Sequence, residues 1–103
     1  MIKPSNNDFT IAVYDLIERV PMGKVVSYSQ VSVMCGRPGS TRRVGQIAHF
    51  GPTELPWHRL VHANGLMALG FVPGGPDNQA KLLIDEGVEV VKGKVLIGKY
   101  QWI

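Results

Sequence analysis

The chain has 103 residues, which is the size of one domain with room for a single modest core. Eleven Lys and Arg residues against eight Asp and Glu residues give a net charge of +3, which allows a nucleic-acid partner but does not demand one. The single cysteine excludes an internal disulfide, and the three histidines lack the spacing of metal ligands, so we expect neither a metal nor any other cofactor.

The first predicted element is a helix from Phe9 to Val20. Asn7 or Asp8 can cap its start, and Pro21 ends it because proline disfavours helical backbone in the residue before it. Its apolar residues recur at the spacing of one helix face, which predicts a side turned toward the core: Phe9, Val13, Leu16, Ile17 and Val20.

A short apolar link, Val25-Val26, precedes a second predicted helix. Ser27 followed three residues later by Gln30 is a capping box, in which each residue bonds the backbone N–H of the other. This pair predicts a short helix over 28–35, and Gly36 is a typical stop signal after it.

A third helix is predicted over 42–50, with Ser40 or Thr41 as its cap and Gly51 as its end. Two short helices joined by a tight turn that contains glycine form a helix-turn-helix pattern. On the third helix one face is apolar, with Val44, Ile47 and Ala48. Another side carries Arg42, Gln46 and His49, with Arg43 next to them. Basic residues therefore cluster at the start of this helix.

The C-terminal part is predicted to mix short strands with one helix. Leu60-Val61 is expected to form a brief strand, and Asn64-Gly65 to turn. A helix is predicted over 77–86, with Pro76 near its first position and with Ala80, Leu83 and Ile84 available to face the core. Segments 88–91 and 94–97 flank Lys92-Gly93, which suits a hairpin.

These elements predict a fold that is mostly α with a small β hairpin, in one domain over residues 1–103. The architecture expected is a single helix-turn-helix DNA-binding domain of winged-helix-like form. The N-terminal segment lacks the apolar stretch of a signal peptide, and no apolar run is long enough to span a bilayer. We therefore expect a cytoplasmic protein without a membrane partner. It is expected to be a monomer, because nothing resembles a dimerisation helix.

The tetrapeptide Pro56-Trp57-His58-Arg59 resembles the Pro-Cys-His-Arg active-site motif of the O6-alkylguanine-DNA alkyltransferases, whose cysteine takes an alkyl group from a damaged guanine. An indole has no thiolate and cannot displace carbon from oxygen at neutral pH, so no transferase activity is expected. Further landmarks follow in the family's order, at 21–28, 42–45, 64–65, 74–75 and 82–87. The chain is thus similar to the C-terminal domain of these enzymes, and tryptophan in place of cysteine points to the alkyltransferase-like proteins.

The resemblance implies a mode of DNA binding. The helix-turn-helix enters the minor groove, Arg42 fills the gap left by a flipped nucleotide, and Tyr28 pushes the target phosphate. General physics agrees with this, because the O6 atom is reached only by taking the base out of the stack, and a planar guanidinium can replace the lost stacking. The residues expected to contact DNA are Arg42, Arg43, Tyr28, Gln46, Ser40 and Thr41.

The same resemblance implies a pocket that receives the extruded guanine. We expect it to be lined by Trp57, Pro56, Tyr28, Val72 and Pro73. Gly51 stands where the family usually has an asparagine, and Val72-Pro73 stands where it has Tyr-Ser. Polar contacts to the base from these side chains are therefore absent, and an apolar pocket discriminates poorly among alkyl groups.

His58 and Glu86 match the residues that activate the cysteine in the enzymes. Without a thiol to deprotonate, they are expected to form a buried hydrogen-bonded pair that holds the loop, as a structural remnant of an active site, with Arg59 bracing it. Cys35 is expected to be a small buried apolar residue.

The sequence therefore predicts a non-catalytic protein whose partner is double-stranded DNA containing O6-alkylguanine. The resemblance further implies that it passes the lesion to nucleotide excision repair proteins. The alternative is a helix-turn-helix transcription regulator without lesion preference. An enzyme that uses Cys35, or a water held by His58 and Glu86, is disfavoured, because Cys35 precedes the predicted helix over 42–50 and no metal or oxyanion site is evident.

Overall fold

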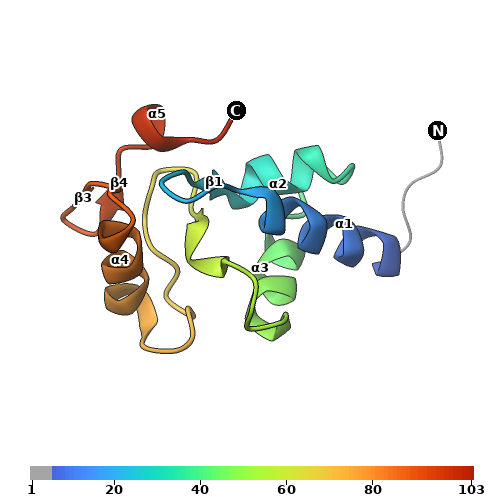
Figure 1. Ribbon diagram of the computed structural model, residues 1–103. Helices are drawn as coiled ribbons and strands as arrows, with labels where there is room; N and C mark the ends of the chain where they lie inside the picture. Colours follow the sequence, from blue (N-terminus) through green and yellow to red (C-terminus); the bar gives the residue numbers. More distant parts are fainter. Residues whose placement is uncertain (1–5) are drawn as a thin grey trace.

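The computed structural model describes residues 6–103 (Figure 1). The elements in chain order are α1 (Asn6–Arg19), β1 (Val26–Ser27), α2 (Tyr28–Met34), α3 (Thr41–Phe50), the 3-10 turn η1 (Trp57–Arg59), β2 (Leu60–Val61), α4 (Gly75–Asp85), β3 (Val90–Val91), β4 (Lys94–Val95) and α5 (Ile97–Tyr100). None of the helices in this part of the chain is long and apolar enough to cross a bilayer.

The apolar core has two parts. The first cluster joins α1, α2 and α3, and it includes Val26 of β1 and Leu60 of β2. The second joins α4 to the C-terminal hairpin through Leu83, Val88 and Val95. Figure 1 shows α1 to α3 gathered on one side and α4 with the β3–β4 hairpin on the other, with η1 and β2 between them. The segment that carries Trp57 therefore lies at the junction of the two halves.

Helix α1 turns its predicted face to the core. All five predicted residues are at most 2% exposed: Phe9, Val13, Leu16, Ile17 and Val20. The expected cap is wrong, because the helix already begins at Asn6, so that Asn7 and Asp8 lie inside its first turn. The residue before Asn6 lies outside the described part of the chain.

The helix-turn-helix is confirmed. The amide of Gln30 donates to the Ser27 hydroxyl at 3.1 Å, and the Ser27 amide donates to the Gln30 side chain at 3.3 Å, which completes the capping box. Helix α3 begins at Thr41, one residue before the predicted start, and Ser40 occupies the cap position without a side-chain bond. Val44 and Ile47 are buried, as expected for the apolar face.

The link before α2 is a strand that the sequence pattern did not predict. β1 pairs in parallel with β2, with Val26 opposite Leu60 and Ser27 opposite Val61. The predicted strand at Leu60-Val61 is therefore confirmed. This pairing fixes the start of α2, which carries Tyr28, next to the end of η1.

Helix α4 begins at Gly75, two residues before its predicted start. Leu83 is fully buried as expected, but Ile84, expected to face the core, is 54% exposed. The side of the helix that faces inward carries Gln79 and Leu83, one turn apart, and Gln79 is 0% exposed. A buried glutamine at this place means that the core contact of α4 is partly polar.

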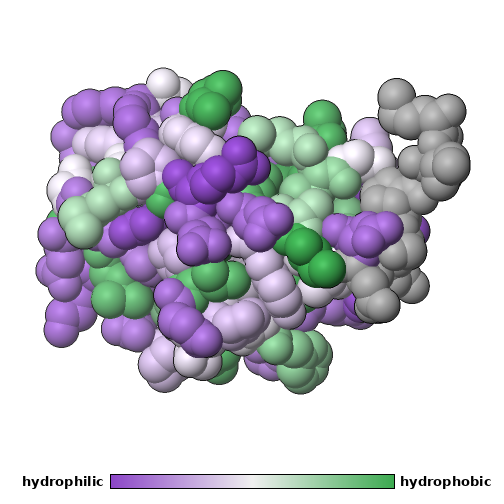
Figure 2. All heavy atoms as spheres, turned by 45° about the vertical axis from the view of Figure 1, so that its right-hand side comes forward, coloured by the Kyte–Doolittle hydropathy of each residue, from purple (hydrophilic) through white to green (hydrophobic). Residues whose placement is uncertain are grey.

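The C-terminal hairpin pairs Val90 with Val95 and Val91 with Lys94, and β3 packs against α4. Its predicted second strand over 94–97 is too long, because α5 begins at Ile97. The residues after α5 return to the first half of the molecule, where the Trp102 amide donates to the Val25 carbonyl at 2.8 Å. Figure 2 shows one face of the molecule, on which hydrophobic residues form separate small patches among polar ones.

Candidate lesion-binding pocket and nucleic-acid interface

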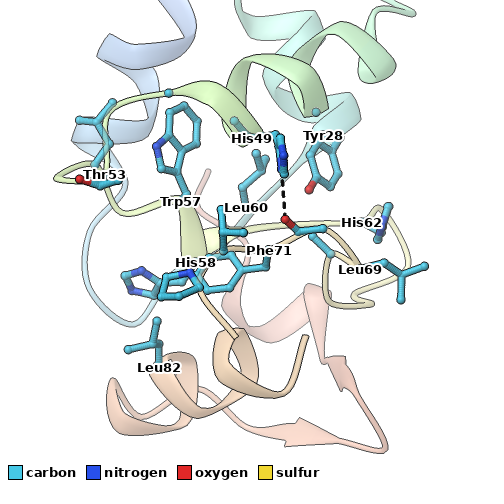
Figure 3. Close-up of a pocket in the computed structure, with 18 of the residues that line it drawn as sticks. Tyr28, His49, Thr53, Trp57, His58, Leu60, His62, Leu69, Phe71 and Leu82 are labelled. Carbon is cyan, nitrogen blue, oxygen red and sulfur yellow. Dashed lines mark hydrogen bonds between the residues drawn. The ribbon is translucent and has the colours of Figure 1, made fainter. Parts of the chain in front are cut away.

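A pocket of about 650 Å³ lies between α3, η1 and the loop before α4 (Figure 3). Helix α3 contributes Thr41, Arg42, Gly45, Ala48 and His49, η1 contributes Trp57 and His58, and the loop contributes Ala68 to Pro73. The lining is mainly apolar, as is usual for pockets that receive a small organic group.

Four of the five predicted pocket residues line it: Trp57, Tyr28, Val72 and Pro73. Pro56 does not belong to its wall, and that expectation is wrong. It precedes η1, where its carbonyl accepts the Arg59 amide at 3.1 Å. Its ring has no N–H to donate, and its restricted backbone suits the first position of a tight turn. Pro56 therefore shapes the turn that presents Trp57.

The indole of Trp57 is held on two sides. Its Nε1–H donates to the Pro52 carbonyl at 2.7 Å, so the one polar atom of the ring is satisfied. Its ring meets the Tyr14 ring edge-on, with 6.0 Å between the centroids and 74° between the planes. The indole thus packs against the first core cluster while it forms part of the pocket wall. It is a fixed apolar surface in the pocket.

The start of α3 places basic and polar side chains at the rim of the pocket. Thr41 and Arg42 are exposed and line it. Arg43 points elsewhere, since its guanidinium donates to the Gln46 side chain at 3.4 Å on the exposed surface. Ser40 lies just before the helix. Of the two adjacent arginines, only Arg42 lies in the pocket wall.

Tyr28 lines the pocket from the first turn of α2. Its ring centre lies 5.0 Å from that of His62, at a tilt of 46°. Burial raises the pKa of the Tyr28 hydroxyl, so it stays protonated at neutral pH and can donate a hydrogen bond. Gly45 of α3 faces this ring, and an added Cβ there would be 4.0 Å from Tyr28, which is an ordinary contact.

The residues predicted to be the remnant of an active site, His58, Arg59 and Glu86, form a hydrogen-bonded network around the Glu86 carboxylate. His58 Nε2 lies 2.8 Å from Glu86 Oε2, and Arg59 donates to both carboxylate oxygens at 3.0 Å and 2.7 Å. Arg59 also donates to the Val20 carbonyl at 2.8 Å, which ties the turn to the end of α1.

The charge of Glu86 follows from this network. Burial alone raises the pKa of the Glu86 carboxyl, but hydrogen bonds from Arg59 and His58 outweigh it and lower the pKa from 4.5 to about 2. The carboxylate is therefore ionised across the physiological pH range, and the positive charge of Arg59 balances its negative charge. Its side chain is 12% exposed and that of Arg59 is 13% exposed, so the pair is largely shielded from solvent.

Gln79 is a second polar link that sequence reasoning missed. Its side-chain oxygen accepts the Ala68 amide at 2.7 Å, and its nitrogen donates to the carbonyls of His58 at 3.2 Å and Leu60 at 2.8 Å. One buried side chain thus joins the pocket loop, η1 and β2 to α4. Glutamine is usually exposed, and Gln79 stands beside the polar residue Asn78, so nothing in the sequence indicated that it is buried.

The pocket wall also includes His49, Leu69 and Phe71, which were not predicted. His49 Nδ1 lies 3.3 Å from the Gly70 carbonyl, which links the last turn of α3 to the tip of the loop (Figure 3). Leu69 is 87% exposed at that tip. The apolar run over 66–72 was a signal for this loop, but it did not reveal which side chains face the pocket.

Cys35 packs against the first core cluster at the end of α2, but it is only half-buried, whereas a buried residue was expected. It is not part of the pocket wall. Burial raises the pKa of its thiol, Arg19 opposes this and Asp15 adds to it, and the net shift is upward. A raised pKa makes the thiolate scarcer at neutral pH. Within residues 6–103, no group of three or more His, Cys, Asp or Glu side chains is placed to hold a metal ion.

Comparison with known proteins identifies the family. The sequence model described as "6-O-methylguanine DNA methyltransferase, DNA binding domain" matches residues 8–88. Alkyltransferase-like protein 1 of Schizosaccharomyces pombe is 32% identical over 103 residues, covering 93% of this chain and 95% of that protein. The DNA base-flipping protein of Vibrio parahaemolyticus is 33% identical over 99 residues, covering 93% of this chain and 97% of that protein.

A solved structure agrees with this. The crystal structure of Schizosaccharomyces pombe Atl1 in complex with damaged DNA containing O6-carboxymethylguanine superposes with a TM-score of 0.84 at 30% identity, covering 94% of this chain and 96% of that one. The predicted fold class and the predicted family are both confirmed. The chain belongs to the 6-O-methylguanine DNA methyltransferase DNA-binding-domain family, and within it to the alkyltransferase-like proteins.

Proposed function

We propose that this protein recognises O6-alkylguanine in double-stranded DNA by flipping the damaged base into the pocket beside Trp57, and that it leaves the alkyl group in place. The observation that carries the proposal is that Arg42, at the exposed start of α3, lies in the wall of the same pocket as Trp57. A base that leaves the duplex next to Arg42 enters this pocket directly.

Each step of flipping has a side chain suited to it. Taking a base out of the stack costs a few kcal/mol, and the cost is lower when alkylation has weakened its pairing. The Arg42 guanidinium is planar and charged, so it can fill the vacated space and face the neighbouring bases. The protonated hydroxyl of Tyr28 lies in the pocket wall, where it can contact the phosphate of the rotated nucleotide.

The pocket supports the purine without a reacting group. Trp57 offers an apolar surface and has its only polar atom bonded to Pro52. The one cysteine, Cys35, lies outside the pocket wall and has a raised pKa. His58 and Glu86 are bonded to each other and to Arg59, and we propose that this network holds the turn in position.

The chemistry of the walls supports tolerance of different alkyl groups. Leu69, Phe71, Val72 and Pro73 surround the loop side of the pocket. Apolar walls distinguish poorly between a small alkyl group and a larger one, because each extra methylene changes the binding free energy by only about 1–3 kcal/mol. We therefore propose that the class of ligand is O6-alkylguanine in general.

The test is binding to two duplexes that differ only by one O6-methylguanine, at one fixed salt concentration, followed by analysis of the recovered lesion. Tighter binding to the damaged duplex, with the methyl group still on the guanine, supports the proposal. Equal affinity for both duplexes rejects lesion recognition and favours the transcription-regulator alternative. Loss of the methyl group rejects the non-catalytic reading.

When a protein binds a lesion without removing it, other proteins must remove the lesion. We propose that the complex passes the lesion to nucleotide excision repair proteins. The measurement is the excision rate of the damaged strand by a nucleotide excision repair system, with and without the protein. A faster rate that depends on Arg42 supports the transfer, and an unchanged or slower rate rejects it.

A further inference from the structure

Gly51 is the residue at which α3 ends, and it lies in the pocket wall. Its backbone has φ −78° and ψ 174°, which is an extended conformation that any residue adopts. The absence of a side chain is therefore not required by the φ and ψ angles of residue 51. Its reason must lie in the space around the Cα atom.

That space is already filled by the indole of Trp57. A Cβ atom on residue 51 would lie 2.5 Å from Trp57 Cζ2 and 3.0 Å from Trp57 Cε2. It would also lie 2.9 Å from the Ile47 carbonyl oxygen. The contacts with Trp57 Cζ2 and with the Ile47 carbonyl are shorter than a Cβ atom tolerates, so one added methyl group requires the indole to move and the end of α3 to adjust.

The core side of the indole is already occupied. It meets the Tyr14 ring edge-on and packs against a cluster of buried side chains, which resist movement of the ring into the core. A close-packed core does not yield space for a ring. The remaining side is the open pocket, whose wall the indole forms.

We propose that Gly51 is a specificity-determining residue, because its missing side chain lets the Trp57 indole lie back from the pocket and leaves room for an O6-alkyl group. The inference rests on the proposed function, since it concerns the size of the lesion that the pocket accepts. It makes the pair of Gly51 and Trp57 a unit: the large residue at one position requires the smallest at the other.

The experiment compares Gly51→Ala with Gly98→Ala. Gly98 lies in α5, where an added Cβ has no neighbour within 4 Å, so it controls for the general effect of alanine. The first readout is the nitrogen–proton resonance of the Trp57 indole, assigned by its loss in Trp57→Phe. In Gly51→Ala this resonance should shift and its proton should exchange faster, because the bond to Pro52 is broken.

The second readout is affinity for duplexes that carry O6-methylguanine or the bulkier O6-benzylguanine. Overpacking of this kind changes equilibria by about tenfold or more. We expect Gly51→Ala to lose about tenfold in affinity for the benzyl lesion, less for the methyl lesion, and nothing for undamaged DNA. Gly98→Ala should match the wild type on all three duplexes.

The outcomes separate this inference from the proposed function. A folded Gly51→Ala protein with an unmoved indole resonance, or with equal losses on both lesions, overturns the inference. If the variant does not fold, the affinities are compared in Trp57→Ala and in Trp57→Ala with Gly51→Ala, where the second change should have no effect on the benzyl lesion. Absence of lesion preference in the wild type rejects the proposed function, whereas the indole shift in Gly51→Ala would still be observed.

Discussion

The two halves of this molecule build the pocket by different means. Helices α1 to α3 are held together by an apolar cluster, and they present Arg42 and Tyr28 on its outside. The C-terminal half lines the pocket with the loop before α4, and it holds the turn that carries Trp57 through two polar side chains, Gln79 and Glu86. Apolar packing is not directional, whereas hydrogen bonds are. The positions of Arg42 and Tyr28 therefore depend on apolar packing, whereas the turn that carries Trp57 is also held by polar bonds.

The largest effect of a single substitution is expected at Glu86. Glu86→Ala leaves Arg59 largely buried without its carboxylate, and breaking a shielded ion pair in this way costs about 3–5 kcal/mol. We expect that loss in the free energy of unfolding, measured with denaturant. Glu89→Ala is the control, because Glu89 pairs with Lys99 on the exposed surface and its removal should change stability little. Equal effects of the two substitutions would contradict a structural role for the Glu86 network.

The second link of the C-terminal half is tested by Gln79→Leu. The change leaves the Ala68 amide and the carbonyls of His58 and Leu60 without their partner, which we expect to cost about 2–3 kcal/mol in the free energy of unfolding. Lesion affinity should fall with it, because the loop and the turn are no longer joined. Gln101→Leu, an exposed residue with one bond to Gln30, is the control. A stable Gln79→Leu protein would mean that packing alone holds the pocket.

The same network predicts how stability depends on pH. The pKa of Glu86 is lowered from 4.5 to about 2 in the folded protein, so the folded state binds fewer protons than the unfolded state between these values. The stabilisation is complete above 4.5 and is lost as the pH falls toward about 2, by roughly 2 kcal/mol. Denaturant unfolding at a series of acidic pH values measures it. Glu86→Ala should remove this part of the pH dependence, and an identical profile for both proteins would refute the assignment.

In the half formed by α1 to α3, the role of Arg42 is tested by comparing Arg42→Ala with Arg43→Ala. Both remove one positive charge, but only Arg42 lies in the pocket wall. We expect Arg42→Ala to weaken binding to damaged DNA by about tenfold, or about 1.4 kcal/mol, and to reduce the preference for the lesion. Arg43→Ala should weaken binding to damaged and undamaged DNA alike. The assignment of Arg42 fails if both variants keep the wild-type lesion preference.

The sequence predicted the helix-turn-helix half well because its signals are local. The spacing of Phe9 to Val20 and the capping box of Ser27 and Gln30 are each contained in one helix, and both appear in the structure. The strand at Leu60-Val61 was predicted, but its parallel pairing with Val26 was missed, because a two-residue strand gives no sign of its partner and this pairing joins distant parts of the chain.

The C-terminal half was predicted less well because its contacts are polar and long-range. Ile84 was expected inside because it is apolar, yet Gln79 takes the buried side of α4 since it can satisfy three backbone groups there. The cavity is lined by four of the five residues predicted for the pocket and not by Pro56, because a motif specifies order along the chain and not the direction of each side chain.

The tryptophan at position 57 has a consequence for how many lesions one protein molecule can bind and how long each complex lasts. A cysteine that has taken an alkyl group becomes a thioether and has no thiolate left, so each protein molecule would be consumed by a single lesion. An indole bonded to Pro52 undergoes no such change. Under the proposed function, occupancy of damaged DNA is then governed by mass action, and the lifetime of each complex is the time the flipped base takes to return to the stack. The same molecule can mark one site, dissociate and mark another.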